Sequence, residues 1–497
     1  MRRLRWIAAV CLPLGIGLAG CGLTRPPATV EAPFPAQWHA PLPHGGSVAS
    51  LADWWRQLDD PLLVELIAAA EAASPNLASA AARVAEARST RVQAGAALLP
   101  NLDGTLSASR GVSGSSFGAG GTTASSSTSA SAAIAPVTTL QAGLQSKWEI
   151  DLFGRLRADR DSAEQKLSSA TAKWHDARVA VAAETANAYF AERACQQQLR
   201  VAESDAKSRG ETARLTDLSA RAGFTAPADA ALARASASDA SGRLTQQRAQ
   251  CAVQRKALVA LSGIDEPTLE EKLASSPAQR ALPVVGSIAS VPAEAISQRP
   301  DVYAAELGVA SASADVGSAE AERYPKLSIS GSIGRMQIRT SGFRASLDTW
   351  SIGPVSLTVP LLDGGARAAN SDAAKARYTE AVSLYRANVR QAVREVEEAL
   401  VNLDATDARA TDADSAVKNY QASFDATQAR YQSGLASLFE LEDSRRTLFA
   451  AQTARVSLQR ERTEAWVALY RSMGGGWARP ESTSLTSNPA AKVATSP

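Results

Sequence analysis

The sequence predicts a mostly α-helical chain, built as two structural repeats, that also carries β-strands suited to a membrane barrel. Residues 366–432 contain neither proline nor glycine, several segments alternate apolar and polar side chains, and a set of landmarks recurs at nearly constant spacing. Aromatic residues make up only 5% of the chain, while alanine is abundant throughout. This composition suits close-packed helices with small residues at their contacts better than one large globular core.

The N-terminus has the features of an export signal. A basic stretch is followed by a short apolar run, Trp6–Gly17, and then by Leu18-Ala19-Gly20-Cys21. This pattern resembles the bacterial lipobox, in which the signal peptide, here residues 1–20, is removed and the cysteine thiol takes a lipid. We therefore expect lipidation of Cys21 and, because Gly22 is not an aspartate, sorting to the outer membrane. The alternative is an ordinary signal peptide with an unrelated cysteine.

Several classes of function are disfavoured by composition. After the leader no stretch reaches the roughly 18 consecutive apolar residues of a transmembrane helix. The 52 basic and 50 acidic residues nearly balance, whereas a nucleic-acid partner selects a basic surface. The three histidines have no metal-spaced partner, and phosphate-loop and nucleophile motifs are missing. The sequence therefore predicts a protein that is not an enzyme and has no cofactor other than a covalent lipid.

The two halves of the chain repeat one another. Pro75 and Pro100 recur as Pro300 and Pro325, 225 residues later. Farther along the offset is 211 residues, shared by Gly154 with Gly365, Glu184 with Glu395, and Gly223 with Gly434. The 14-residue difference falls around a Ser/Gly/Thr-rich tract at 110–131, which is typical of a loop. Constant offsets at several positions indicate an internal duplication with one longer loop in the first half.

Each half contains two predicted strands, at about 101–110 and 139–153 in the first half and at about 326–336 and 350–362 in the second. Apolar and polar side chains alternate along them, as in strands whose two faces meet different surroundings. This alternation fits a half-buried soluble sheet, and it equally fits a membrane barrel with one face toward lipid and the other toward a wet lumen. Pro354 and Pro360 weaken the last strand because proline has no N–H for the ladder.

Long helices with heptad-like apolar stripes are predicted for most of the remaining chain. One stripe steps by three and four residues from Tyr378 to Leu403. At about 1.5 Å per residue, the uninterrupted stretch 366–432 would extend about 100 Å as one helix. No compact domain is as deep as this helix is long, so the sequence predicts either a coiled coil or a wall built of long helices.

Each long helix is expected to turn back at a glycine, Gly223 in the first half and Gly434 in the second. Cys195 and Cys251 lie 28 residues before and after Gly223, so an antiparallel hairpin would place them at the same height. Because the compartment outside the inner membrane is oxidising, we predict a Cys195–Cys251 disulfide. The alternative is a pair of inert buried thiols, since the direction in which each side chain faces is not known.

Short segments along most of the chain carry a family resemblance. They are Trp54-Trp55, Asp59–Leu62, Ala97–Pro100, Trp148–Gly154, Gln298–Asp301, Val359–Gly365, Ala468–Tyr470 and Met473–Trp477. Taken together, in this order and with the internal repeat, they resemble the outer-membrane efflux family typified by TolC and OprM, and specifically its lipoprotein branch. The resemblance covers nearly everything from residue 54 to residue 477.

The resemblance implies a trimeric TolC-like fold. Four strands per chain cannot close a barrel, for which about eight strands are the practical minimum, and an open edge in lipid leaves backbone groups unpaired. Three chains supply twelve strands, and the long helices of the family continue that barrel as a tunnel across the periplasm. External loops are expected at Arg110–Pro136 and Gln337–Asp348. The layout is a lipid-anchored segment at 21–60, repeats at 61–265 and 291–475, a linker at 266–290 and a disordered tail at 476–497.

The resemblance also places the helix tips at a periplasmic mouth. The family carries acidic residues just past the second tip, where Glu440 and Asp443 stand in this chain, three residues apart on one helix face. In a trimer each would form a ring of like charges around a closed aperture. A first-turn acid also complements the helix dipole, and Glu440 forms a capping box with Ser437. The residues expected to contact a periplasmic adaptor are Gly223, Phe224, Gly434 and Leu435.

The implied function is a passive exit duct of a tripartite efflux system. A homotrimer in outer-membrane lipid would work with a periplasmic adaptor and an inner-membrane pump of the RND type, which would supply the energy. The alternative is a lipid-anchored periplasmic coiled-coil scaffold without a pore. A scaffold shares the helices and the lipid, but it has no use for four alternating strands at matched positions. The sequence does not name the transported substrate.

Overall fold

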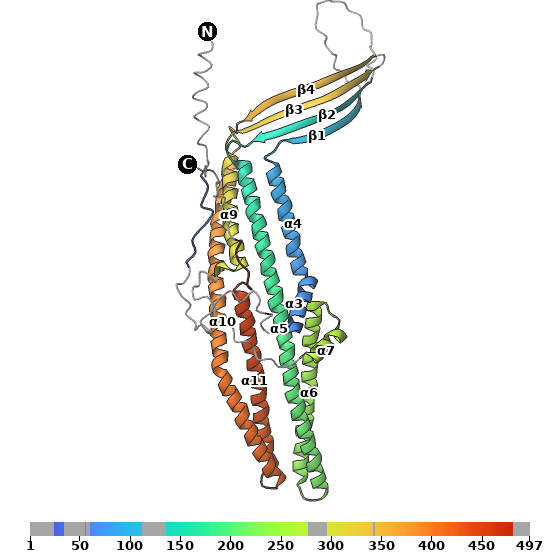
Figure 1. The fold of residues 1–497 in the computed structure, drawn as a ribbon, viewed down its shortest axis with the longest axis vertical. Coiled ribbons are helices and arrows are strands. Elements are labelled where there is room, and N and C mark those ends of the chain that lie inside the picture. The colour runs from blue at the N-terminus through green and yellow to red at the C-terminus, as the bar shows by residue number, and fades with distance from the viewer. Residues whose placement is uncertain are drawn as a thin grey trace, which may run out of the picture. The chain divides into compact units, whose positions relative to one another are not determined.

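The computed structural model describes residues 24–33, 55, 60–111, 136–276, 296–340 and 343–480. Its elements, labelled in Figure 1, are α3 (Pro61–Ala73), α4 (Pro75–Ala96), β1 (Asn101–Gly111), β2 (Val137–Ile150), α5 (Arg155–Arg221), α6 (Pro227–Ser262), α7 (Glu266–Ser275), α9 (Pro300–Ala321), β3 (Lys326–Thr340), β4 (Phe343–Thr358), α10 (Ala366–Gln432) and α11 (Leu438–Ser472). The predicted signal peptide and Cys21 lie outside the described residues.

The predicted duplication and the predicted long helices are confirmed. Helices α4 and α9 have 22 residues each, α5 and α10 have 67 each, and α6 and α11 have 36 and 35. Helix α10 spans the stretch that lacks proline and glycine. The chain divides into two compact units, residues 1–30, 85–168 and 307–383 in the first, and residues 31–84, 169–306 and 384–497 in the second. Each unit is described by itself below.

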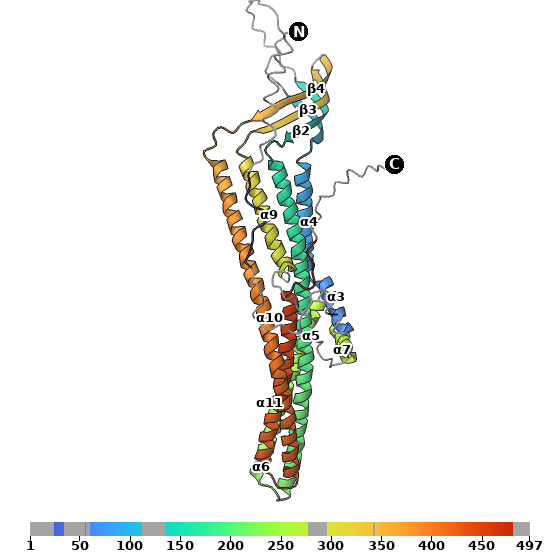
Figure 2. The ribbon, with the colours of Figure 1, turned by 60° about the vertical axis from the view of Figure 1, so that its left-hand side comes forward.

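The first unit contains one antiparallel sheet in the order β1-β2-β3-β4 (Figures 1 and 2). The pairs Gly111–Val137 and Thr340–Phe343 lie at one end of the sheet, called here the hairpin end. Most of the loop predicted at Arg110–Pro136 lies outside the described residues. Gly143 and Gly334 lie opposite each other on β2 and β3. A Cβ added at either glycine would come within 2.9 Å of a carbonyl oxygen of the facing strand. Only glycine permits such close backbone approach, and glycine at these positions lets the two strands bend together.

Strand boundaries in the second half differ from the prediction. Strand β3 continues to Thr340 and β4 begins at Phe343, so the external loop predicted at 337–348 is wrong and the two strands form a tight hairpin instead. Because most side chains in this stretch are polar, it lacks the apolar–polar alternation from which strands were predicted. Backbone hydrogen bonding between the strands does not depend on side-chain polarity, so the strands continue through it. Strand β4 ends at Thr358, before Pro360. Residues 353–354 face the single residue Ser330, and such a bulge accommodates proline.

Helices α6 and α11, with the parts of α5 and α10 after residues 168 and 383, form two antiparallel hairpins in the second unit. This unit also includes elements that the sequence predicted to be irregular. The proposed linker begins with helix α7, which Asp265 caps and whose Leu269 and Leu273 are buried. The proposed tail is ordered through its first residues, because Trp477 packs 5.5 Å from the Tyr303 ring and Arg479 pairs with Glu306. None of the described helices has the length and hydropathy of a membrane span.

Candidate functional site

The two helical hairpins turn in the same way, at the predicted glycines. Gly223 and Gly434 have positive φ values of 80° and 74°. At the first tip the backbone N–H of Phe224 donates to the carbonyl of Ser219, and that of Gly223 donates to the carbonyl of Ala220. At the second tip the N–H of Leu435 donates to the carbonyl of Arg430, and that of Gly434 donates to the carbonyl of Tyr431. These pairs are the two hydrogen bonds of a Schellman motif, which requires a left-handed residue at the turn. Replacing either glycine would therefore strain the backbone of the tip.

The returning helices start differently. Ser437 caps α11, since its Oγ accepts from the backbone N–H of Glu440 at 3.2 Å, as the capping box predicts. Ala226 precedes α6 and offers no side-chain cap, and Pro227 occupies the first helical position, where an N–H is not needed. The second tip therefore has the firmer helix start, and its first turns hold the two acids singled out by the sequence.

Glu440 and Asp443 are both exposed on the face of α11 opposite its buried leucines. Each has a basic partner: Asp443 pairs with Arg446 at 2.5 Å, and Glu440 lies 3.5 Å from Arg430 on the preceding helix. Exposed pairs of this kind contribute little to stability, about 0–1 kcal/mol. The acids are therefore free to serve another purpose without loss of the fold.

Large apolar side chains at the tips are exposed to solvent. Phe224 is 87% exposed, Leu435 71% and Phe439 73%. Beside them a small apolar core draws on all four helices and consists of Ala213, Ala233, Phe424, Leu438, Leu441 and Leu448. The tips therefore have an interior that is complete within one chain and an apolar outer surface that is not covered by the chain's described residues.

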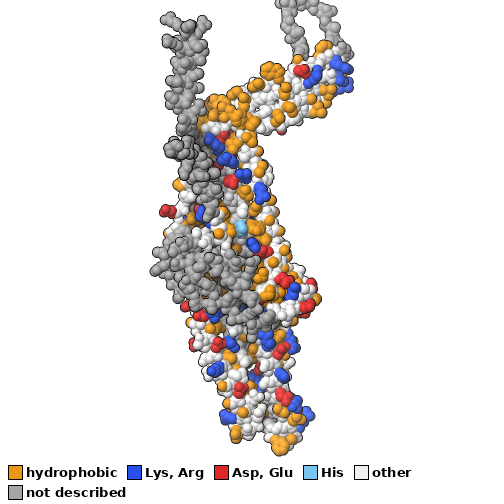
Figure 3. All heavy atoms as spheres, viewed as in Figure 1, with side chains coloured by type: hydrophobic (Ala, Val, Ile, Leu, Met, Phe, Trp, Pro, Cys, Tyr) orange, Lys and Arg blue, Asp and Glu red, His pale blue; other side chains and the backbone are white. Residues whose placement is uncertain are grey.

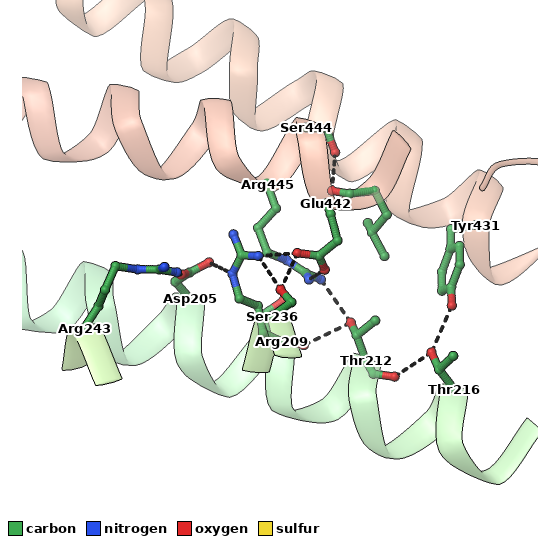
Figure 4. Close-up of polar contacts among 12 residues, drawn as sticks. Asp205, Arg209, Thr212, Thr216, Ser236, Arg243, Tyr431, Glu442, Ser444 and Arg445 are labelled. Carbon is green, nitrogen blue, oxygen red and sulfur yellow. Dashed lines mark hydrogen bonds and ion pairs between the residues drawn. The ribbon is translucent and has the colours of Figure 1, made fainter. Parts of the chain in front are cut away.

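A buried polar network next to this core connects the two hairpins (Figure 4). Glu442 of α11 accepts from Arg209 of α5 and, at 2.6 Å, from Ser236 of α6. Arg209 also donates to Ser236 at 2.6 Å and to Asp205 at 2.8 Å, and Arg243 pairs with Asp205 from α6. One carboxylate of the second hairpin thus binds both helices of the first.

Arg445 makes the second tie between the hairpins. It donates to Glu442 at 2.5 Å and to Thr212 Oγ1 at 3.0 Å, and its guanidinium lies 5.6 Å from the centre of the Phe424 ring. Burial lowers the pKa of Arg445, and the neighbouring Glu442 opposes that effect. Nearer the tip, the hydroxyls of Thr216 and Tyr431 lie 3.1 Å apart. Separating the hairpins would break the contacts that cross between them, namely those of Glu442 with Arg209 and Ser236, of Arg445 with Thr212 and of Thr216 with Tyr431.

Sequence reasoning missed this network. The spacing of Glu442 and Arg445 predicts an ion pair within one helix, as does that of Asp205 and Arg209. Neither spacing reveals that the two pairs meet, because that depends on the rotation of each hairpin about its axis. The only sequence feature that could have indicated the network is the presence of long charged side chains near a proposed tip. Taken alone, such side chains indicate an exposed helix face.

The structure joins Cys195 on α5 and Cys251 on α6 by a disulfide, with the Cα atoms 5.5 Å apart. Both cysteines are buried. Gln247, one turn before Cys251, donates to Cys195 Sγ at 3.2 Å. The bridge fastens the first hairpin; the second hairpin has no cysteine.

The sheet of the first unit is the other unusual surface. Residues opposite one another in the register face the same side, so Leu144, Ile333 and Trp350 share one face. Trp148, Ile329 and Val355 lie on the same face, four residues along β2 and β3. Trp350 is 74% exposed and Ile352 84%. Serine, threonine, glutamine and lysine side chains occupy much of the opposite face. Figure 3 shows hydrophobic side chains along the visible face of the sheet. An apolar face of this extent requires a covering by other apolar matter.

Within the described residues no cluster of metal-ligating side chains is present. The site consists instead of two surfaces, the apolar sheet face and the hairpin tips. Neither has the enclosed arrangement of nucleophile, base and oxyanion donors that catalysis requires.

Comparison with known proteins relates these surfaces to one family. The family model for outer membrane efflux proteins matches residues 66–264 and 291–475. The chain is 32% identical to the pyoverdine export outer membrane protein OpmQ of Pseudomonas aeruginosa, over 96% of this chain and 97% of that protein. It is 29% identical to the solvent efflux pump outer membrane protein SrpC of Pseudomonas putida, over 93% and 96% of the two chains.

Solved structures agree. The outer-membrane channel OprN superposes with a TM-score of 0.74 at 26% identity, covering 91% of this chain and 99% of that one. The outer membrane protein VceC of Vibrio cholerae gives a TM-score of 0.71 at 27% identity, covering 86% and 99%. Through both of its repeats, this chain belongs to the outer membrane efflux protein family.

Proposed function

We propose that three copies of this chain form the outer-membrane exit duct of a tripartite efflux system, through which substrates pass passively. The observation that carries the proposal is the sheet. It has two open edges, β1 and β4, and an exposed apolar face. In lipid an open edge leaves backbone groups unpaired at several kcal/mol each, whereas a closed barrel leaves none. Three copies supply twelve strands, which exceeds the minimum of about eight for a barrel.

The height of the apolar face supports a membrane position. On β2 the apolar side runs from Leu140 to Ile150, ten steps of about 3.3 Å, or about 33 Å along the strand. A tilt of roughly 35–45° reduces this to about 25 Å, the height of the apolar band on outer-membrane barrels. The opposite, polar face would then line a water-filled lumen.

The hairpin tips would form the periplasmic mouth of the duct. Glu440 and Asp443, exposed near the second tip, would each give a ring of three carboxylates in the trimer, favouring cations and resisting close approach of the three copies. Opening would require the two hairpins of each chain to part, which breaks the network around Glu442. The exposed Phe224 and Leu435, with Gly223 and Gly434, would contact a periplasmic adaptor through apolar packing.

An inner-membrane pump would supply both the energy and the choice of substrate. The relatives named above are named for different substrates, pyoverdine for OpmQ and solvents for SrpC. A passive duct with a polar lumen is compatible with both. A lipid on Cys21 would anchor each copy in the outer membrane; metabolic labelling with a radioactive fatty acid should label the exported protein and not the Cys21→Ser variant.

The decisive experiment is ion conductance of the purified full-length protein in planar bilayers, together with its mass in detergent. The duct predicts a trimer and discrete conductance steps. A monomer that conducts nothing would support the competing function, a lipid-anchored periplasmic scaffold without a pore.

A further inference from the structure

Arginines gather on the apolar face at the hairpin end of the sheet. In the register Arg110 on β1 aligns, through Thr138 on β2, with Arg339 on β3 and Arg344 on β4. Arg335 lies four residues before Arg339 on the same face. All four arginines are exposed, and Figure 3 shows basic side chains concentrated at this end of the sheet.

These charges are poorly balanced within the chain. Asp348, paired with Arg335 at 3.3 Å, is the one acidic residue on this face of the described strands. Arg339 donates only to the neutral Gln337, at 2.7 Å, and among the described residues neither Arg110 nor Arg344 has a carboxylate partner. Arg339 and Arg344 lie directly opposite each other, and like charges in that position destabilise a strand pair. A bound anion would remove the repulsion.

The arginines also follow the edge of the apolar band. On β1 the apolar residues of this face end at Ala108, just before Arg110, whereas on β4 the apolar band begins at Trp350, four residues past Ser346, the residue that aligns with Ala108. The boundary therefore moves by four residues, about 13 Å along the strand. When strands are tilted by roughly 35–45°, the membrane plane crosses each strand at a different position along its length. Across three strand spacings that position changes by about 10–14 Å. The basic residues consequently mark one membrane surface and the zone beyond it.

We infer that this arginine belt, Arg110, Arg335, Arg339 and Arg344, binds the phosphate groups of lipid headgroups in the outer leaflet. The inference rests on the proposed function, which puts the sheet in the outer membrane and the helix tips in the periplasm. The hairpin end would then face outward, because the helices join the strands at the opposite end of the sheet. Phosphate oxygens accept the forked hydrogen bonds of guanidinium groups, and the lipid tails of the same molecule would cover the neighbouring apolar band. In the trimer the belt surrounds the barrel.

The test uses the full-length trimer in detergent and measures binding of diphosphorylated lipid A by native mass spectrometry. The variant Arg339→Gln/Arg344→Gln removes two charges from the belt, and Lys147→Gln/Lys326→Gln removes two from the opposite face as a matched control. At about 1 kcal/mol for each basic residue near a lipid surface, the belt variant should bind about 30-fold more weakly. The control variant should bind like the wild type.

Further arms identify the source of the phosphate. The wild type should bind dephosphorylated lipid A about as weakly as the belt variant binds the diphosphorylated lipid. Inorganic phosphate should not displace lipid A from the wild type. Equal binding by the wild type and the belt variant, or effective competition by inorganic phosphate, would overturn the inference. Conductance of the same samples keeps the two proposals apart, because a conducting trimer without phosphate preference contradicts only the lipid site, and a monomer without conductance contradicts the duct.

Discussion

The sheet and the hairpin tips place polar and apolar residues in opposite ways. On the sheet, large apolar side chains such as Ile352 are exposed, and the edges of β1 and β4 have no partner strand among the described residues. At the tips, charged side chains are buried: Arg445 is 4% exposed and Arg209 10%. Both of these arginines donate across to the other hairpin, Arg209 to Glu442 and Arg445 to Thr212. The sheet is thus incomplete in one chain, whereas the tip closes its own interactions.

This difference indicates what each region needs in order to work. Under the proposed function the sheet would reach a stable state only with other copies and with lipid, so its contribution would depend on assembly. The tip is held by contacts inside each chain, so it would open and close without dissolving the assembly. The predictions below separate these two kinds of dependence, beginning with the largest expected effect.

A charge on the apolar face of the sheet should prevent assembly in the membrane. Ile329 lies within the apolar band, between Trp148 and Val355, and Lys at such a depth costs about 2–4 kcal/mol, in each of three copies. Ile329→Lys should abolish the heat-modifiable trimer in outer-membrane fractions on gel electrophoresis. Ser328→Lys, one residue earlier and on the polar face, should assemble normally. Equal assembly of both variants would mean that the two faces do not meet different surroundings.

Removing the carboxylate at the centre of the tip network should loosen the tips without affecting assembly. Glu442→Gln leaves Arg209 and Arg445 buried without their shared anion, and breaking a buried pair costs about 3–5 kcal/mol. We expect faster amide hydrogen exchange at both tips and a larger single-channel conductance. The matched change Glu461→Gln disrupts an exposed pair with Arg409 and should alter neither quantity. Unchanged exchange in Glu442→Gln would show that the network does not hold the hairpins together.

Removal of the Cys195–Cys251 bridge should destabilise the first hairpin. For residues separated by 56 positions, loop-closure entropy gives about 4 kcal/mol as an upper value, since the hairpin is already constrained by helix packing. Cys195→Ser/Cys251→Ser should lower the Tm of the helical signal in circular dichroism, and a reductant should lower that of the wild type equally. Peptide mapping that finds both cysteines as free thiols in the exported protein would contradict the bridge itself.

The smallest effect on stability is expected for the exposed acids. Asp443→Asn removes a surface pair with Arg446 worth about 0–1 kcal/mol, so Tm should not change. Loss of a ring of three carboxylates should nevertheless reduce cation selectivity, measured as the reversal potential across a salt gradient. Asp414→Asn, which breaks an exposed pair with Arg455 farther along the same helices, serves as the control. Identical reversal potentials for both variants would exclude Asp443 from the aperture.

Much of the architecture was predictable because it depends on local rules. The 67 residues of α10 follow from the absence of proline and glycine, and both tips follow from a glycine that completes a Schellman motif. The repeat located the corresponding elements of the other half. Strand alternation identified the sheet faces, but it did not identify the polar ends of β3 and β4, where backbone pairing continues without an apolar pattern.

What the sequence did not predict depends on how elements meet. Glu442 lies among ordinary charged residues of a helix, and its burial follows from the rotation of α11 against α5 and α6. The alignment of Arg110, Arg339 and Arg344 requires the register of all four strands, and a shift of one residue would move each side chain to the other face. Helix α7 was assigned to a linker because its ten residues are too few for a strong periodic pattern.

The pooling of strands between copies can be tested by cysteine cross-linking across the sheet edges. Strands β1 and β4 of one chain are separated by β2 and β3, about 14 Å apart, too far for a disulfide within the chain. Chains carrying Ser107→Cys together with Thr349→Cys, Ser351→Cys or Ser356→Cys, oxidised in outer-membrane vesicles, should give a covalent band of three chains on a non-reducing gel for at least one pair. Monomers for every pair, or ladders longer than three chains, would contradict the closed trimeric barrel.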